Sequence, residues 1–509
     1  MNLHHEEHEA HEDSLSGFPP FILLRALRVL RGASTIFTLV SLAACGSGGD
    51  SGNGITLGTL AYVETECHDT KQGFVEHQRL RIRQGEREPV TVFATHVGPV
   101  SGVGGICHGV NVARWSFTSL AREAIQNVVV SPDGTSVVFE VTDEFSTFPP
   151  LPLNLPPEQK GIFWVGADGA GLRSLGPPSR GRLFFINNGG GNTGVNILGE
   201  WSFSPDGRTV VLVDKASDTQ GHESDQLVTV EIATGRRTQV TALPPAVPPA
   251  GYPRDAPTVT WPVFIDDRTI SFSSSANLDG LNPDNTWRQM TINTETHQLT
   301  VPPPIPIALP TGQIQLSLVI TGDRPQAVRV PPLGGALSGP GDIFAIDERQ
   351  NILQLTDFGR PDTYPPVVDV DEEHIYFPAS ADPLGINRTQ NCQIFSIDRL
   401  GNNLRQLTNF HETEHSTWGC NFGTRPKGCG LYLPLTQRQA VQDPRGRTLL
   451  FYSSCDPFGT NPNGGQIFAI QPDGTGLRQL TNSRGLVKEA DGTYSGELPG
   501  PGAYGPYAP

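Results

Sequence analysis

The sequence predicts an all-β protein, a β-propeller of six to seven four-stranded blades. Three observations lead to this prediction. A unit of turn, strand, loop, strand, turn and strand recurs along the chain, and no stretch keeps a helical period. Turn-forming residues are abundant, with 57 glycines and 45 prolines among 509 residues. A repeated unit of about three to four strands is typical of propellers.

The repeat is most complete at residues 443–481. It begins with a turn at 443–446, continues with apolar strands at 449–452 and 466–470, and ends with a turn and a Leu-Thr pair. Similar units occupy 57–122, 128–175, 201–241, 264–300, 314–356 and 369–408. The first unit either forms a blade of its own or supplies a strand that completes the last blade and closes the ring.

Each part of the repeat has a physical basis. Ser-Pro-Asp-Gly at 131–134 and 204–207 suits a tight turn, because Pro presets φ, Asp bonds its own backbone and Gly takes a positive φ. The apolar runs that follow have the β-branched content of central strands. In the first unit, the alternation at 79–83 predicts a half-buried strand.

The N-terminal region predicts export. A polar leader with His4, His5, His8 and His11 could bind metal weakly. A basic stretch then precedes a short apolar segment at 33–42, which is too short to span a bilayer and has the shape of a signal peptide.

The signal ends in Leu-Ala-Ala-Cys, with the cysteine at Cys45. This sequence resembles the lipobox of bacterial lipoproteins. The resemblance implies that Cys45 is lipidated and anchors the chain at the cell envelope, in the outer membrane facing the periplasm. An ordinary secretory signal followed by a free cysteine is the alternative.

The repeats at 127–176 and 443–481 resemble the TolB-like propeller repeat of bacterial periplasmic proteins. They share an apolar-Ser-Pro-Asp-Gly or similar turn, two apolar strands and a closing Leu-Thr. The resemblance covers roughly residues 125–486 and implies a propeller. TolB also carries an α/β domain ahead of its propeller, where this chain has β-like sequence, so a TolB role is not implied.

These observations divide the chain into four segments. We expect a leader and lipoprotein signal peptide at 1–45, a flexible Gly/Ser tether at 46–55, a propeller at 56–486 and a loose Gly/Pro-rich tail at 487–509. Six cysteines remain after Cys45, an even number that predicts disulfides in an exported protein. The proposed pairs are Cys67–Cys107, Cys420–Cys429 and Cys392–Cys455, with other pairings left open.

Three units share the pattern Asp/Asn-x-x-Gly-x-Asn after a strong strand. In a propeller these loops would emerge on one face, where their oxygens could bind Ca²⁺. Each loop brings only one or two carboxylates, and the pattern also suits a plain turn, so we favour a binding face without metal. The candidate residues are Asn277, Asp279, Asn282, Asp382, Asn387, Asp456 and Asn461.

A second metal candidate is His411-Glu412-x-x-His415, which matches the zincin pattern. That chemistry needs both histidines on one helical face, with the glutamate as base. Here the motif follows the end of a blade, and nothing nearby predicts a helix. A solvated loop is the preferred interpretation.

The formal net charge of −16 argues against a nucleic-acid surface, which needs a basic stripe. With no catalytic constellation evident, we predict a monomeric, lipid-anchored propeller without a cofactor. It would act as a non-catalytic binding or scaffold module for an envelope protein, peptide or glycan. The alternative is a metal-dependent hydrolase or lyase with its site in the central channel.

Overall fold

The chain is a β-propeller. The computed structural model describes residues 57–70, 73–100, 124–142, 155–180, 184–185, 196–197, 201–247, 258–301 except 279, 281 and 287, 326–329, 343–346, 352–357, 369–370, 374–410 except 380, 389, 390 and 399, 431–432, 448–460 except 454, and 466–505. Apart from a single 3₁₀ turn at Pro157–Gln159, the regular structure in these ranges is β-strand, which confirms the predicted fold class. None of the helical structure described is long and apolar enough to cross a membrane.

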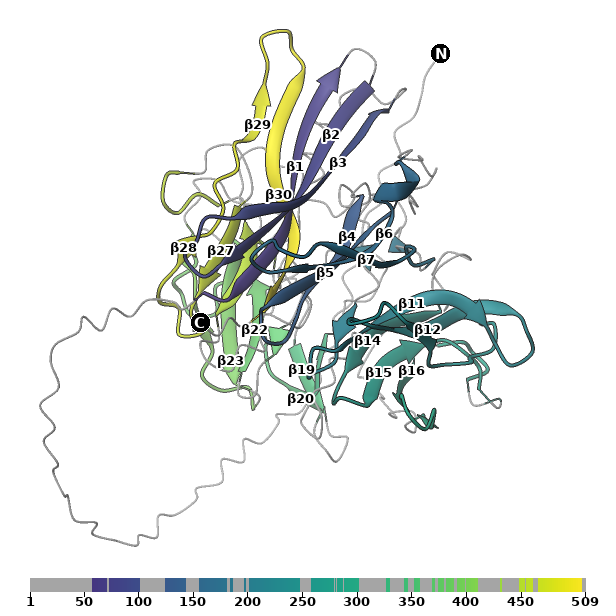
Figure 1. Cartoon of the computed structure of the whole chain (residues 1–509). Helices are drawn as coiled ribbons and strands as arrows, with labels where there is room; N and C mark the ends of the chain where they lie inside the picture. Colours follow the sequence, from purple (N-terminus) through teal and green to yellow (C-terminus); the bar gives the residue numbers. More distant parts are fainter. Residues whose placement is uncertain are drawn as a thin grey trace, which may run out of the picture. The chain divides into compact units, whose positions relative to one another are not determined.

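Six blades follow one another along the chain (Figure 1). Each is an antiparallel sheet whose strands are consecutive in sequence; blade 4 has three described strands and the others have four. Blade 1 comprises β4 (Ile125–Val130), β5 (Ser136–Val141), β6 (Gly161–Gly166) and β7 (Arg173–Gly176), and blade 2 comprises β10 (Ser202–Phe203), β11 (Thr209–Ser217), β12 (Glu223–Glu231) and β13 (Arg237–Gln239). A short pair, β8 (Phe184–Phe185) and β9 (Asn196–Ile197), lies between them in sequence.

The remaining blades repeat this order. Blade 3 comprises β14 (Val259–Phe264), β15 (Thr269–Ser274), β16 (Arg288–Asn293) and β17 (Leu299–Thr300), and blade 4 comprises β18 (Gln326–Arg329), β19 (Ile343–Ile346) and β20 (Ile352–Gln354). Blade 5 comprises β21 (Asp369–Val370), β22 (His374–Ala379), β23 (Gln393–Asp398) and β24 (Arg405–Gln406). Blade 6 comprises β25 (Leu431–Tyr432), β26 (Leu449–Ser453), β27 (Gln466–Ile470) and β28 (Arg478–Gln479).

A further sheet, here called the closing sheet, joins the two ends of the described chain (Figure 1). Its strand order is β29-β30-β1-β2-β3. The strands are β1 (Thr59–Thr70), β2 (Gly73–Gln84), β3 (Val90–Val100), β29 (Gly485–Lys488) and β30 (Tyr494–Gly505). The first unit therefore does not complete the last blade, which has four strands of its own.

The described part of the segment 487–509, which ends at residue 505, is not the loose tail that its composition predicts. Most of it forms β30, which pairs antiparallel with β1 from Thr59↔Gly505 to His68↔Ser495. Strand pairing uses main-chain hydrogen bonds, so a partner strand supplied by the distant N-terminal region overrides the weak local β-propensity of glycine and proline.

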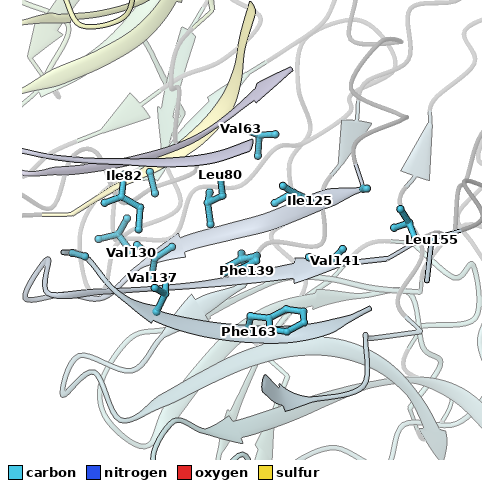
Figure 2. Close-up of a cluster of buried hydrophobic side chains, with 14 residues drawn as sticks. Val63, Leu80, Ile82, Ile125, Val130, Val137, Phe139, Val141, Leu155 and Phe163 are labelled. Atoms are coloured by element: carbon cyan, nitrogen blue, oxygen red, sulfur yellow. The ribbon is translucent and has the colours of Figure 1, made fainter. Parts of the chain in front are cut away.

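The closing sheet lies between blades 1 and 6. On one face, Val63, Leu80 and Ile82 pack with Phe139 and other core residues of blade 1 (Figure 2). On the other face, Leu60 and Tyr62 pack with residues of blade 6. Successive residues of β1 point to opposite faces, so a strand that is apolar at adjacent positions can bury both.

The two faces of the propeller follow from antiparallel pairing. The turn between the first and second strands and the turn between the third and fourth strands share one face, called the lower face. The loops between the second and third strands share the other, upper face with the connections between blades.

At the lower face of blade 1, Ser131 Oγ donates to Asp133 Oδ1 at 2.6 Å and accepts from the Ser136 amide at 3.0 Å. Gly134 takes φ 70°, as the Ser-Pro-Asp-Gly turn predicts.

The threonine of the closing Leu-Thr pair holds the outermost strand of a blade to the third strand by hydrogen bonds. In blade 6, Thr481 Oγ1 donates to Gln466 Oε1 at 2.7 Å and accepts from the Ile467 amide at 2.9 Å. The same bonds join Gln226 to Thr241 and Gln393 to Thr408. Both side chains are buried, so each bond replaces lost water contacts and explains why threonine recurs at this position.

Candidate functional site

The three Asp/Asn-x-x-Gly-x-Asn loops lie between the second and third strands of blades 3, 5 and 6, and so share the upper face. In blade 3, the buried Asn282 side chain donates to the Thr286 carbonyl at 2.8 Å and accepts from the Thr286 hydroxyl at 3.0 Å. The backbone amide of Asn282 donates to Asn277 Oδ1 at 2.8 Å. The final asparagine is thus used to hold its own loop.

The loop of blade 5 is held in the same way. The buried Asn387 side chain donates to the carbonyls of Ala381 at 3.0 Å and Asn391 at 2.8 Å, and its amide donates to Asp382 Oδ1 at 2.6 Å. In blade 6, Asp456 Oδ1 accepts from the Thr460 amide at 2.7 Å. Asp279 and Asn461 lie outside the described residues. The described oxygens of these loops therefore serve loop geometry.

The other predicted site residues fall into two groups. Cys45, Cys107, Cys420, Cys429, His411, Glu412 and His415 lie outside the described residues. Cys67, Cys392 and Cys455 are buried. Cys392 and Cys455 belong to one core cluster shared by blades 5 and 6, which is compatible with the proposed pair, and the pairing stays a prediction.

The closing sheet carries a cluster of ionisable residues that the sequence reasoning missed. Glu64, Glu66 and His68 alternate along β1 on the face that continues from Leu60 and Tyr62. Arg79 and Arg81 of β2 and Glu497 of β30 lie beside them, with Glu64 paired to Arg79 and Glu66 paired to Glu497 in register. These six residues are called the carboxylate–arginine cluster.

The cluster lies at the upper end of the closing sheet. Thr59, at the start of β1, donates to the Gly134 carbonyl in a lower-face turn at 2.6 Å. Glu64 accepts from Ser483, which follows the last strand of blade 6, at 3.4 Å. Because β1 has 12 residues and β4 and β5 have 6 each, the strand continues past the blade beside it.

The arginines join the carboxylates of the cluster. Arg79 Nη2 lies 2.5 Å from Glu66 Oε2, and Arg79 Nη1 lies 3.3 Å from Glu497 Oε1 and 3.9 Å from Glu64 Oε2. Arg81 Nη1 lies 2.9 Å from Glu64 Oε2, and His68 Nε2 lies 3.0 Å from Glu66 Oε1. One guanidinium therefore bridges carboxylates from two strands.

The environments of Glu64 and Glu66 shift their pKa values in opposite directions. Burial, followed by the negative charge of Glu497, raises the pKa of Glu64 despite its two arginines. The hydrogen bond from His68, assisted by Arg79, lowers the pKa of Glu66. The Glu64 side chain is 9% exposed, whereas Glu66 is 27% and His68 is 42% exposed. The cluster thus has a buried carboxyl whose pKa is raised and a more open carboxylate whose pKa is lowered.

A serine also lies near the cluster. Ser495 of β30 is the register partner of His68, which would complete a Ser-His-Glu arrangement. Its hydroxyl is buried, accepts from Arg484 Nη2 at 3.2 Å and donates to Glu489. Ser495 is therefore engaged by other groups and is not positioned as a nucleophile.

The cluster does not fit a resident metal ion. Its three carboxylates each contact an arginine, and a cation would have to displace a guanidinium. In the part of the chain that the structure describes, no group of three or more His, Cys, Asp or Glu side chains could hold a metal. We therefore derive no step through a metal at this cluster.

No protein-family model matches the chain, and no curated protein matches it in sequence. Among solved structures, it is similar to the acylaminoacyl peptidase of Pyrococcus horikoshii, with 9% identity, a TM-score of 0.40 and coverage of 83% of this chain and 50% of that one. The β-propeller domain of the trilobed protease from Pyrococcus furiosus matches at 8% identity and TM-score 0.38, over 83% and 98% of the chains. An oligogalacturonate lyase in complex with manganese matches at 11% identity and TM-score 0.34, over 69% and 80%.

The prediction of a non-catalytic binding or scaffold module is corrected by this comparison. The solved structures named in this comparison come from peptidases and oligogalacturonate lyases, not from non-catalytic scaffolds. The chain spans about half the length of the acylaminoacyl and prolyl peptidases it matches. At these identities the likeness concerns the fold, and no substrate or mechanism is transferred.

Proposed function

We propose that this chain is a hydrolase or lyase that cleaves glycosidic bonds by acid–base catalysis at the carboxylate–arginine cluster. The observation that carries the proposal is the opposite displacement of the pKa values of Glu64 and Glu66, two carboxyls on one face of β1. A pair of titratable groups whose environments separate their pKa values is the arrangement that divides acid and base roles.

The proposed chemistry uses only side chains of this cluster. Glu64 donates its proton to the glycosidic oxygen, so that the leaving sugar departs as an alcohol. Glu66 accepts a proton, either from the attacking water of a hydrolase or from a sugar carbon in the elimination of a lyase. His68 lies 3.0 Å from the Glu66 carboxylate, and His68 and Arg79 lower the pKa of this group.

The test is to replace each carboxyl by its amide. Glu64→Gln and Glu66→Gln should each lower the rate of glycan cleavage by about 10²–10⁴-fold, the usual contribution of a general acid or base. Glu86→Gln is the matched control, because Glu86 is an exposed carboxylate that contacts Arg478 outside the cluster. The substrates are envelope glycans, uronic-acid oligosaccharides and, for comparison, peptides.

The product separates the two reaction classes. New reducing ends alone indicate hydrolysis, and an additional ultraviolet absorbance from an unsaturated sugar indicates elimination. Full activity in both glutamine variants, or cleavage confined to the peptides, would refute the proposal.

We also propose that the protein acts at the bacterial cell envelope as a monomer. The lipobox-like sequence ending at Cys45 and the TolB-like repeats support this location. In cells fed a labelled fatty acid, the wild-type chain should carry the label in the outer-membrane fraction, and Cys45→Ala should not. Equal labelling of the two chains would contradict anchoring through Cys45.

A further inference from the structure

We infer that His77 and His96 form a chelating site for one divalent transition-metal ion on the closing sheet. The two residues are register partners on the adjacent strands β2 and β3. Their Nδ1 atoms lie 3.2 Å apart, and the ring centroids are 4.4 Å apart with planes tilted by 56°. Neither ring is fully buried, so an ion can reach the pair.

The separation of the two nitrogens fits chelation of a single ion. Imidazole nitrogens bind Zn²⁺ at about 2.0–2.1 Å. Two such bonds that end on atoms 3.2 Å apart enclose an angle of about 100° at the metal. This value lies between the right angle of tetragonal Cu²⁺ or Ni²⁺ sites and the tetrahedral angle of Zn²⁺ sites.

The hydrogen bond between the two rings does not block a metal. One ring donates a hydrogen from its Nδ1 atom to the Nδ1 atom of the other ring. In its other tautomer the donor ring carries this hydrogen on Nε2, which leaves both Nδ1 lone pairs available to an ion.

The neighbouring charges favour a cation. Glu66 is the register partner of His77 on β1, and Glu497 continues the same row on β30. Arg79, the nearest cation on β2, is already paired with Glu66 and Glu497. Water completes the coordination. Imidazole ligands select Zn²⁺, Ni²⁺ or Cu²⁺ over Mg²⁺ and Ca²⁺, so the site differs in class from the Ca²⁺ loops that the sequence predicts.

The bound ion would link β2 to β3. The inference rests on the cross-strand geometry of His77 and His96 and on the charges beside them, and it is independent of the proposed glycan cleavage. Because the ion binds the folded sheet, it should raise the melting temperature in proportion to its affinity and concentration.

The experiment measures Zn²⁺ uptake by the full chain without an affinity tag. His4, His5, His8 and His11 are replaced by Gln in every variant, because this N-terminal tract can bind metal by itself. We expect one Zn²⁺ per chain by equilibrium dialysis. His77→Gln and His96→Gln should each weaken binding by about tenfold or more, equivalent to ~1.4 kcal/mol. His222→Gln is the matched control, because His222 lies on blade 2 and contacts Asp218.

A second measurement does not depend on the variants. Electron paramagnetic resonance of the Cu²⁺-loaded protein should show coupling to two imidazole nitrogens. Uptake that is unchanged in His77→Gln and His96→Gln, or a copper signal with no nitrogen coupling, would overturn the inference. A stabilising effect of Mg²⁺ equal to that of Zn²⁺ would also contradict it.

Discussion

The closing sheet differs from the six blades in how it is built and in what it carries. Each blade forms from one continuous stretch of chain, and β26 and β27 of blade 6 have 5 residues each. The closing sheet combines strands from both ends of the chain, and β1, β2 and β30 have 12 residues each. In the blades, buried polar side chains form hydrogen bonds that hold neighbouring strands and loops together. The closing sheet presents partly exposed carboxylates, arginines and histidines.

This difference shows how a repeat protein can separate stability from chemistry. In the blades, Gln466 and Asn282 are buried and fully bonded within their own blade, so they fix geometry. In the closing sheet, the ionisable side chains of Glu66, His68 and Arg79 are only partly buried, beside the buried Glu64. The proposed catalytic groups and the proposed metal site both lie there.

The largest effect should come from removing β30. Deletion of residues 494–505 leaves β1 without a partner on one edge and takes a strand out of the sheet between blades 1 and 6. We expect loss of cooperative thermal unfolding, measured by circular dichroism. A peptide of residues 485–505 added in trans should restore the transition, whereas a scrambled peptide should not. A cooperative transition in the deletion variant would show that the blades are stable without the closing sheet.

Two phenylalanines of blade 6 test how much the core of a blade contributes. Phe451 is fully buried and stacks on Phe468 at 5.5 Å, whereas Phe458 in the upper-face loop is 47% exposed. Phe451→Ala should lower the free energy of unfolding by about 3–5 kcal/mol. Phe458→Ala should lower it by less, about 0.5–1.5 kcal/mol, because Phe458 is half exposed but still stacks on Phe468 at 6.4 Å. Chemical denaturation measures both, and equal losses would contradict the assigned burial.

Glu140 of β5 should make the free energy of unfolding depend on pH. Burial raises its pKa from 4.5 to about 7, although Ser179 and Asn127 donate hydrogen bonds to it. The folded state therefore holds a proton that the unfolded state loses, and this contribution to stability is complete below pH 4.5 and lost as the pH rises through about 7. The loss should be about 3 kcal/mol.

Glu140→Gln should remove this slope from the pH profile of the free energy of unfolding. The profile is measured by denaturation at a series of pH values between those two limits. Glu223→Gln, an exposed residue of blade 2, serves as the control and should keep the slope. Parallel profiles for wild type and Glu140→Gln would show that Glu140 is not the source.

The smallest expected effect concerns the hydrogen bonds that Thr481 makes with Gln466 and Ile467 in blade 6. Thr481→Val keeps the side-chain shape but leaves the buried Gln466 Oε1 and the Ile467 amide without this partner. The free energy of unfolding should fall by about 1–3 kcal/mol. Thr475→Val, in an exposed turn, should lower it by less than about 1 kcal/mol. Urea denaturation compares the two variants. A larger loss of stability for Thr475→Val would contradict the proposed stabilising role of Thr481.

The fold was predictable because its signals are local. The Ser-Pro-Asp-Gly turn at 131–134 and the Leu-Thr pair at 480–481 act within one blade, so their spacing along the chain reports the architecture directly. The strands of the first unit were also visible, since the Arg-Leu-Arg-Ile-Arg alternation at 79–83 lies in β2. The length of β1 and the strand formed by 494–505 were not predicted, because they depend on pairing between the two ends of the chain.

The candidate site was not predictable in the same way. Glu64, Glu66 and His68 show strand alternation in the sequence, and so do Arg79 and Arg81. Nothing local indicates that Glu497 joins them or that Glu64 is buried. The loop residues that the sequence favoured, Asn282 and Asn387, have oxygen and nitrogen atoms suited to a ligand, but their own loops occupy these atoms.

The sequence by itself determined that this protein consists of short antiparallel sheets repeated around a propeller, because turn chemistry and apolar alternation act over a few residues. The tertiary structure decided that residues 59–100 and 485–505 form one sheet and that their ionisable side chains gather at its upper end. The physical reason is that main-chain pairing accepts almost any partner strand, so contacts between distant segments leave little trace in either segment alone.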